Sequence, residues 1–172
     1  MIFVIGGGHD FSYGSYKGHA LWAKGKIVPI FNFDAHLDVR SVEKNEINSG
    51  TAFWRIVKDL APSIARGKAL IELGIQRSRN PEKLYDFCAK QNISIVEYEP
   101  FLAVMKNLST GHTQKTVEHI RDHFDLCVDL GFDRDHGSAH VSFCLDVLCQ
   151  FIAPGTSAST PFGMDFAELI PA

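Results

Sequence analysis

The chain has 172 residues, of which 45% are hydrophobic and 22% charged, as in an ordinary globular domain with its own core. A net charge of −3 argues against binding to nucleic acid or to an anionic membrane surface. No apolar run reaches the roughly 18 residues of a membrane-spanning helix. The four cysteines form no CxxC pair and no disulfide framework, which indicates reduced thiols in a cytoplasmic protein.

Strand patterns and helix patterns alternate along the chain. We expect strands at residues 1–5, 27–33, 69–75, 93–97 and 141–147. We expect helices at residues 11–24, 51–60, 81–91, 100–106, 113–124 and 162–169. Ser12 is a candidate cap of the first helix, and Pro81 stands in the first turn of the third. Apolar runs buried on both faces are typical of parallel strands covered by helices. The sequence therefore predicts an α/β fold, with an open, mostly parallel sheet between helix layers in one domain, residues 1–172.

Three short polar segments each follow an apolar run. They are residues 6–10 (GGGHD), 34–38 (DAHLD) and 142–146 (SFCLD). In an open α/β sheet, ligands bind beyond the carboxyl ends of the strands. These three segments are therefore expected to converge on one site, although they are far apart in the sequence. The glycines of the first segment allow a sharp turn that brings His9 close to that site.

The second segment has the residue types of a metal site. Asp34, His36 and Asp38 follow one another at two-residue steps, which would place all three on one side of an extended strand end. Carboxylates with one or two imidazoles suit Mn²⁺, and carboxylates can bridge two ions about 3.5–4 Å apart that activate a shared water. A lone Asp-x-His is more often a turn, so the prediction depends on all three segments together.

Residues 5–18, 30–38 and 142–163 resemble the ureohydrolase family of arginase, agmatinase and formimidoylglutamase. Within it the chain looks most like formimidoylglutamase. The clues are residues 9–14 (HDFSYG), 32–40 (NFDAHLDVR), 49–53 (SGTAF) and 73–76 (LGIQ). The resemblance implies an arginase-like three-layer αβα fold and a site for two Mn²⁺ ions. It also implies hydrolysis of N-formimidoyl-L-glutamate to L-glutamate and formamide, in histidine degradation.

The resemblance also implies roles for single residues. Metal ligands would be His9, Asp34, His36, Asp38, Asp146 and the residue at position 144. Asp34 would bridge the ions, and Asp34 and Asp146 would be catalytic. Residues near the substrate would be Arg40, Ser49, Gly50 and Thr51. Arg40 could grip a substrate carboxylate with two hydrogen bonds, or could form a surface salt bridge instead.

Position 144 departs from the family pattern, because Cys144 stands where a bridging aspartate is normal. A thiolate is a softer ligand than a carboxylate, and a thiol buried in apolar surroundings is a poor one. We therefore expect a weakened or partly filled second metal site. The alternative is that Cys144 is only a small core residue.

The resemblance places this chain in the central part of the family fold, truncated at both ends. It implies a small-molecule amidine substrate, no nucleic-acid or membrane partner, and a homo-oligomer in the full-length form. Two other functions stay open at this point. One is an agmatinase or guanidino-acid hydrolase, which shares the metal motifs. The other is a degenerate domain of the same fold without catalytic activity.

Overall fold

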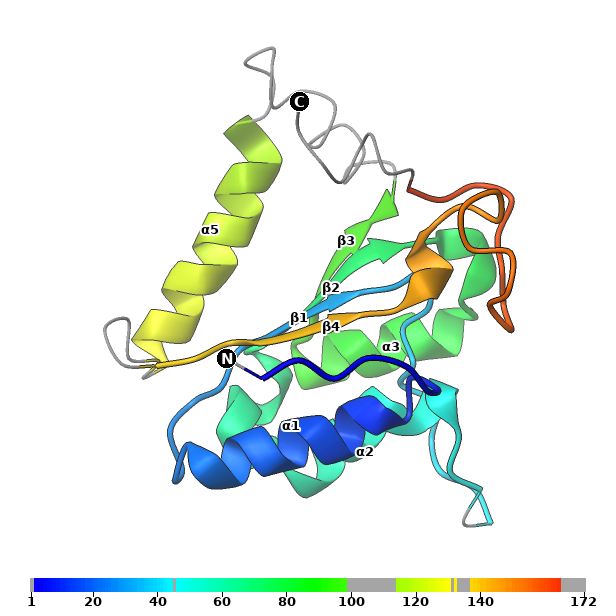
Figure 1. Ribbon diagram of the computed structural model, residues 1–172. Coiled ribbons are helices and arrows are strands. Elements are labelled where there is room, and N and C mark those ends of the chain that lie inside the picture. The colour runs from blue at the N-terminus through cyan, green and yellow to red at the C-terminus, as the bar shows by residue number, and fades with distance from the viewer. Residues whose placement is uncertain (1, 45, 99–113, 131, 133–136, 165–172) are drawn as a thin grey trace.

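The computed structural model describes residues 2–44, 46–98, 114–130, 132 and 137–164. In this part of the chain, four parallel strands form one sheet in the order β3-β2-β1-β4 (Figure 1). The strands are β1 (Ile30–Phe33), β2 (Leu70–Ile75), β3 (Ser94–Glu97) and β4 (His140–Phe143). Because all four are parallel, their carboxyl ends meet at one edge of the sheet.

Helices cover both faces of this sheet. They are α1 (Phe11–Trp22), α2 (Ala52–Asp59), α3 (Glu82–Gln91) and α5 (Gln114–Asp129). Helices α1, α2 and α3 lie on one side and α5 on the other (Figure 1). Short 3₁₀ turns complete the described elements: η1 (Ser49–Thr51), η2 (Ala61–Gly67), η3 (Arg77–Arg79) and η4 (Leu145–Val147). The predicted three-layer α/β architecture is confirmed. Among the described residues, no helix is long and apolar enough to cross a membrane.

Two apolar clusters each include residues of β2, and the register irregularity between Leu73 and Ile75 places Ile75 in the same cluster as Leu70. Leu70 and Ile75 belong to the larger cluster, which includes Tyr16 of α1 and Phe53 of α2. Ile71 and Leu73 belong to the smaller one, with Val96, Val147 and Met164. All six residues of β2 are buried, which explains why this strand appears in the sequence as a continuous apolar run interrupted by one glutamate.

The expected strand at residues 141–147 is wrong in its second half. The strand ends at Phe143, and the chain turns into η4. Cys144 still donates its backbone N–H to the carbonyl of Phe33 at 2.8 Å. In the next backbone hydrogen bond, the Val147 N–H donates to the Cys144 carbonyl at 3.2 Å, which closes a turn instead. The ladder therefore stops at the point where the third polar segment reaches the sheet edge.

The expected strand at residues 1–5 is also wrong. Residues 2–5 have no regular structure, and the exposed fractions of Ile2 and Ile5 are 91% and 95%. An apolar run becomes a strand only when another strand accepts its hydrogen bonds, and among the described residues none does so here. The expected helix at residues 100–106 and most of that at 162–169 lie outside the described residues.

The expected cap of α1 differs as well. Asp10 occupies the N-cap position, and Ser12 lies inside the helix, where it is buried. Its hydroxyl is 3.1 Å from that of Ser142. The contact that decides the role of Ser12 is therefore tertiary, since it joins α1 to β4 rather than closing the helix end.

Gly74 allows β2 to pass close to the third polar segment. Its φ is +86°, and an added Cβ would lie 2.8 Å from Val147 Cγ2. Gly25 has a similar φ of +85° but no atom near such a Cβ.

We expect Gly25→Ala to cost roughly 1 kcal/mol of unfolding free energy from backbone strain alone. Gly74→Ala should cost about 1–3 kcal/mol more, because it adds overpacking. Urea denaturation of both variants measures the difference, and equal losses would contradict the close approach.

Candidate metal centre

The adjacency of β1 and β4 brings two polar segments together. Phe33 pairs with Phe143 in the parallel register, so Asp34 and Cys144 leave the sheet side by side. The first segment joins them from the turn before α1, where His9 Nε2 lies 2.7 Å from Ser142 Oγ. Gly6 and Gly7 in that turn have φ values of +97° and +86°, as the predicted glycine turn requires. All three segments therefore converge at the carboxyl edge of the sheet.

Asp34 is the centre of the cluster, and it is fully buried. Its Oδ2 lies 2.8 Å from His9 Nδ1, and its Oδ1 lies 3.4 Å from His36 Nδ1. Burial by itself would raise the pKa of Asp34, but hydrogen bonds with both imidazoles and the charge of His9 hold it below its ordinary value. Asp34 is therefore ionised, and both imidazoles face its charge.

His9 is held on both sides of its ring. Nδ1 lies 2.9 Å from Asp38 Oδ2, and Nε2 contacts the Ser142 hydroxyl. The ring packs edge-on against Phe53, with the two centroids 5.4 Å apart. Burial would lower the pKa of His9, but the hydrogen bonds with Asp34 and Asp38 raise it to about 12. Without a metal, the imidazole is protonated and serves as the counter-ion of the buried carboxylates.

His36 forms the second half of the cluster with Asp146 from η4. Its Nδ1 lies 3.4 Å from Asp146 Oδ2 and from Asp34 Oδ1 alike. Hydrogen bonds with Asp146 and Asp34 raise the pKa of His36 to about 9, against the effect of its partial burial. Asp34 thus faces an imidazole on each of its two oxygens.

The segment from Asp34 to Asp38 is not extended, contrary to the expectation from its two-residue spacing. β1 ends at Phe33, and Asp38 has a φ of +47°, which is rare for a residue with a side chain. The carboxylate of Asp38 is buried beside Asp34. Burial and the charge of Asp34 together raise the pKa of Asp38 despite its contact with His9. The side chains converge because the loop bends around the site.

Asn80 maintains the shape of this loop, and the sequence analysis missed it. Its Oδ1 accepts a hydrogen bond from the Leu37 N–H at 2.9 Å, and its Nδ2 donates to the Ala35 carbonyl at 2.9 Å. The side chain is buried and also donates to the Gln76 carbonyl. An asparagine just before Pro81 resembles an ordinary turn residue, so local sequence carries no signal for this role.

A buried polar pair lies on β1 and β2, two residues before the site. Asn32 is paired in register with Glu72, and its Nδ2 donates to Glu72 Oε2 at 2.6 Å. Both side chains are fully buried, and burial raises the pKa of Glu72 well above its ordinary value. Burial therefore disfavours a negative charge on Glu72 beneath Asp34. A glutamate inside the apolar run of β2 was the one sequence signal for this pair.

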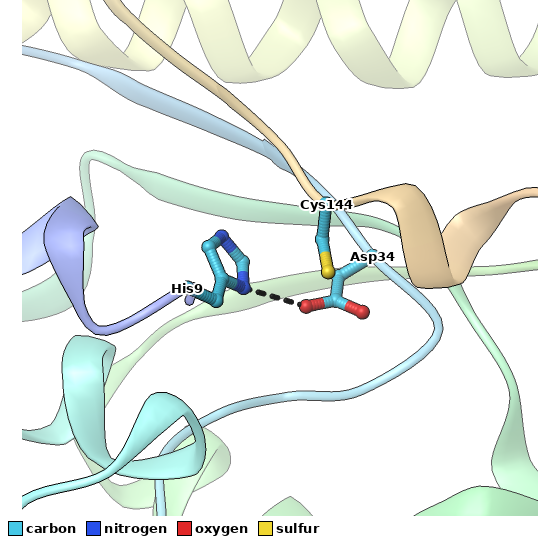
Figure 2. A group of neighbouring side chains, drawn as sticks. All are labelled: His9, Asp34 and Cys144. Atoms are coloured by element: carbon cyan, nitrogen blue, oxygen red, sulfur yellow. Dashed lines mark ion pairs between the residues drawn. The ribbon is translucent and has the colours of Figure 1, made fainter. Parts of the chain in front are cut away.

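Cys144 points its thiol at the same cluster. Figure 2 shows Sγ beside the carboxylate of Asp34, with His9 across from both. Burial raises the pKa of the thiol, although a hydrogen bond with His9 works in the opposite direction. Cys144 is therefore placed where a ligand would be, as a neutral thiol in the metal-free protein. It is not a core residue, since it belongs to neither apolar cluster.

The donor atoms form two groups that share Asp34. One consists of His9, Asp34 and Cys144, and the other of Asp34, His36 and Asp146. Within each group the ligand atoms lie within 4.8 Å of one another. Asp34 Oδ2 is buried, and its close contact is with the His9 imidazole, so a cation between the two residues would also face this oxygen. These residues fit divalent cations, one in each group, and Asp38 stands beside His9 as a further carboxylate.

The residues expected near the substrate lie in the segment between β1 and α2. Arg40 and Thr51 line a cavity of about 390 Å³ that also contains Asn48 and Lys83. The Arg40 guanidinium lies against Gly50, where any side chain would collide with it. The Thr51 hydroxyl is used in a capping box with Asn48, and Ser49 is partly exposed in η1. The structure therefore brings Arg40, Gly50 and Thr51 together, and the cavity also contains Glu43 and Glu46.

A family model described as "Arginase family" matches residues 1–172. This chain belongs to the arginase family. A formimidoylglutamase of Fusobacterium nucleatum is 32% identical over 95% of this chain, which corresponds to 46% of that protein. The chain thus spans about half the length of the curated relatives it matches.

Solved structures agree with this assignment. The crystal structure of formimidoylglutamase from Bacillus subtilis is 29% identical, with a TM-score of 0.73 over 95% of this chain and 45% of that one. The Trypanosoma cruzi formiminoglutamase solved with two Mn²⁺ ions is 26% identical, with a TM-score of 0.73 over 96% of this chain and 49% of that one. The arginase-like fold of this chain and its membership of the arginase family agree with these structures.

The charged histidines predict how the metal-free protein responds to pH. The pKa of His36 is raised from 6.5 to about 9, so its contribution to stability is complete below about pH 6.5. That contribution is lost as the pH rises through about 9. We expect the unfolding free energy of chelator-treated protein to fall between pH 6.5 and 9 by more than that of His36→Asn. Parallel urea-denaturation profiles for the two proteins would contradict the assignment.

The loop clamp predicts an effect on metal affinity. Asn80→Ala should weaken binding of divalent cations by about 10–100-fold, as removal of groups that orient metal ligands does. Asn92→Gly is the matched control at the other end of α3. Asn92 is exposed with a φ of +59°, which glycine adopts without strain. Competition with a metal-sensitive dye measures both affinities, and an unchanged affinity in folded Asn80→Ala would show that the loop holds its shape unaided.

Proposed function

We propose that this chain carries the metal-binding part of a formimidoylglutamase-type hydrolase of linear amidines. The observation that carries the proposal is the pair of donor groups sharing Asp34 at the carboxyl ends of β1 and β4. The similarity to formimidoylglutamases over about 95% of the chain supports the substrate class. The proposed metal is manganese, by analogy with the Trypanosoma cruzi protein solved with two Mn²⁺ ions, with weaker manganese binding at the site that contains Cys144.

The proposed reaction is N-formimidoyl-L-glutamate and water to L-glutamate and formamide. The oxygen of water bonds to the amidine carbon, and the bond from that carbon to the glutamate nitrogen breaks. The two protons of water end on the glutamate amine and on formamide. The substrate would then come from histidine degradation, and the protein would act in the cytoplasm.

Each part of the cluster has a proposed task. Bound metal ions supply an activated water near neutral pH. Asp34 would join the two sites, because its Oδ2 faces His9 and its Oδ1 faces His36. Asp146, partly accessible beside His36, is placed to stabilise the positive charge of the leaving nitrogen when that nitrogen takes up a proton. An amidinium substrate is cationic, so an acidic cluster also attracts it.

Arg40 is proposed to bind a carboxylate of the substrate. Its guanidinium is exposed in the cavity beside Lys83, and the backbone N–H of Arg40 is fixed to the Gly50 carbonyl at 2.9 Å. A guanidinium recognises a carboxylate with two parallel hydrogen bonds. Ser49, Gly50 and Thr51 would shape this end of the pocket. A substrate with carboxylates at one end and an amidine at the other fits this separation of charges.

The full-length form is proposed to be a homo-oligomer. In this chain the outer edge of β4 has no strand beside it among the described residues. Val141 and Phe143 on that strand are 64% and 44% exposed. Unpaired apolar edges favour association with further chain.

One observation favours a second candidate function. Cys144 replaces a carboxylate in one donor group, which supports a domain of this fold that binds a cation but does not turn over substrate. The two functions differ in one measurement, hydrolysis by the metal-loaded protein.

We expect purified protein supplied with Mn²⁺ to release formamide from N-formimidoyl-L-glutamate and to leave agmatine and guanidino acids intact. Asp146→Asn should lower kcat by about 100-fold or more, since charged groups at the reacting centre contribute about 10²–10³. Asp59→Asn, which alters an exposed carboxylate that accepts a hydrogen bond from the Tyr13 hydroxyl, is the matched control and should keep the parent rate. Turnover of a guanidinium substrate alone would refute the proposal, and no turnover of any substrate would support the non-catalytic domain.

A further inference from the structure

The two donor groups of the metal centre differ in chemical softness. The group of Asp34, His36 and Asp146 offers two carboxylates and one imidazole. The group of His9, Asp34 and Cys144 offers one carboxylate, one imidazole and one sulfur. Carboxylates suit hard ions such as Mn²⁺, whereas sulfur selects softer ions such as Zn²⁺. The two groups therefore do not suit the same cation.

The backbone holds the sulfur in place for binding. The N–H of Cys144 is bonded to the Phe33 carbonyl, so the residue continues the β1–β4 register for one step. Figure 2 shows its Sγ beside Asp34 and facing His9, between the ends of β1 and the turn before α1. The three ligand atoms lie within 4.8 Å of one another.

The imidazole of this group is oriented in the same way. Ser142 Oγ holds His9 Nε2 at 2.7 Å, which leaves Nδ1 facing the carboxylates and the sulfur. A hydrogen bond to the second ring nitrogen is the usual means by which proteins fix a metal-binding histidine. Ser142 lies two residues before Cys144 on β4 and is itself buried. One strand end therefore supplies both the sulfur ligand and the residue that orients the imidazole.

The number of ligands also suits zinc. Three protein ligands with a fourth position left open are the arrangement of catalytic zinc sites, and cysteine, histidine and carboxylate are all ligands of that ion. A coordinating thiol gives up its proton to the bound ion, so the neutral state of the buried thiol without metal does not oppose binding of a soft cation.

We propose that the metal centre is asymmetric, with a zinc-class ion on His9, Asp34 and Cys144 and a manganese-class ion on Asp34, His36 and Asp146. This inference deepens the proposed function and rests on it for the catalytic role of the site. It differs from the proposed function in assigning a different ion to each of the two donor groups. Protein loaded with Mn²⁺ alone would then be filled only on the His36 side.

Cobalt reports the sulfur ligand directly, because a thiolate bound to Co²⁺ gives an intense near-ultraviolet charge-transfer band. Anaerobic titration of the metal-free protein with Co²⁺ should produce this band. Cys144→Ser should abolish it and weaken Co²⁺ binding at this position by at least the roughly 10–100-fold that loss of an outer contact causes. Cys149→Ser is the matched control, since Cys149 is also partly accessible but belongs to neither donor group, and it should keep the band.

Ion selectivity is measured on the same proteins. After equilibration with equal concentrations of Zn²⁺ and Mn²⁺ and removal of free metal, we expect one zinc and one manganese per parent chain. Cys144→Asp should bind two manganese ions instead and no longer retain zinc selectively. Circular dichroism melting verifies that each variant is folded. The parent protein must itself show the cobalt band, so it tests the inference even if a variant does not fold.

The outcomes separate this inference from the proposed function. Two manganese ions and no cobalt band in the parent chain would overturn the asymmetric centre, whether or not formamide is released. A cobalt band that depends on Cys144, with mixed metal content, supports it even if no amidine is hydrolysed. Absence of hydrolysis by protein loaded with both ions would then count against the proposed function alone.

Discussion

The structure of the site depends on a single buried carboxylate, that of Asp34. A charge without solvent is costly unless cations or hydrogen bonds surround it. Asp34 meets this demand with one imidazole at each oxygen, and both imidazoles keep a proton well above their usual range. The histidines thus hold the place of metal cations in the metal-free protein. If a metal ion replaced the proton on the His9 or His36 ring, the Asp34 carboxylate would still face a positive charge.

The fold positions that carboxylate through a few backbone features. Parallel pairing of β1 with β4 sets Asp34 beside Cys144, and Gly74 lets β2 pass without a side chain in the way. Beyond the strand, the Asn80 side chain replaces ladder hydrogen bonds that the loop has lost. The unusual φ of Asp38 is maintained by these contacts, as strained conformations at functional sites generally are.

Cys144 affects which cation the site prefers, but it does not affect the membership of this chain in the family. The arginase-family fold needs only the apolar strands and the glycine turns, and these tolerate a cysteine at the end of β4. The metal chemistry depends on the donor atoms, and one sulfur changes which cation a group of three ligands prefers. A chain can therefore keep the fold while its choice of metal changes.

The sequence by itself determined the alternation of strands and helices, the three polar segments and the family, because these follow from periodicity and short-range residue types. It also identified His9, Asp34, His36, Cys144 and Asp146, which the structure brings together. Only the tertiary structure decided that residues 2–5 form no strand and that the segment after Phe33 bends rather than extends. It alone revealed Asn80 and Ser142 as the residues that orient the ligands. Hydrogen bonds between residues 43 to 133 positions apart leave no local pattern, so they are determined only when the sheet has assembled.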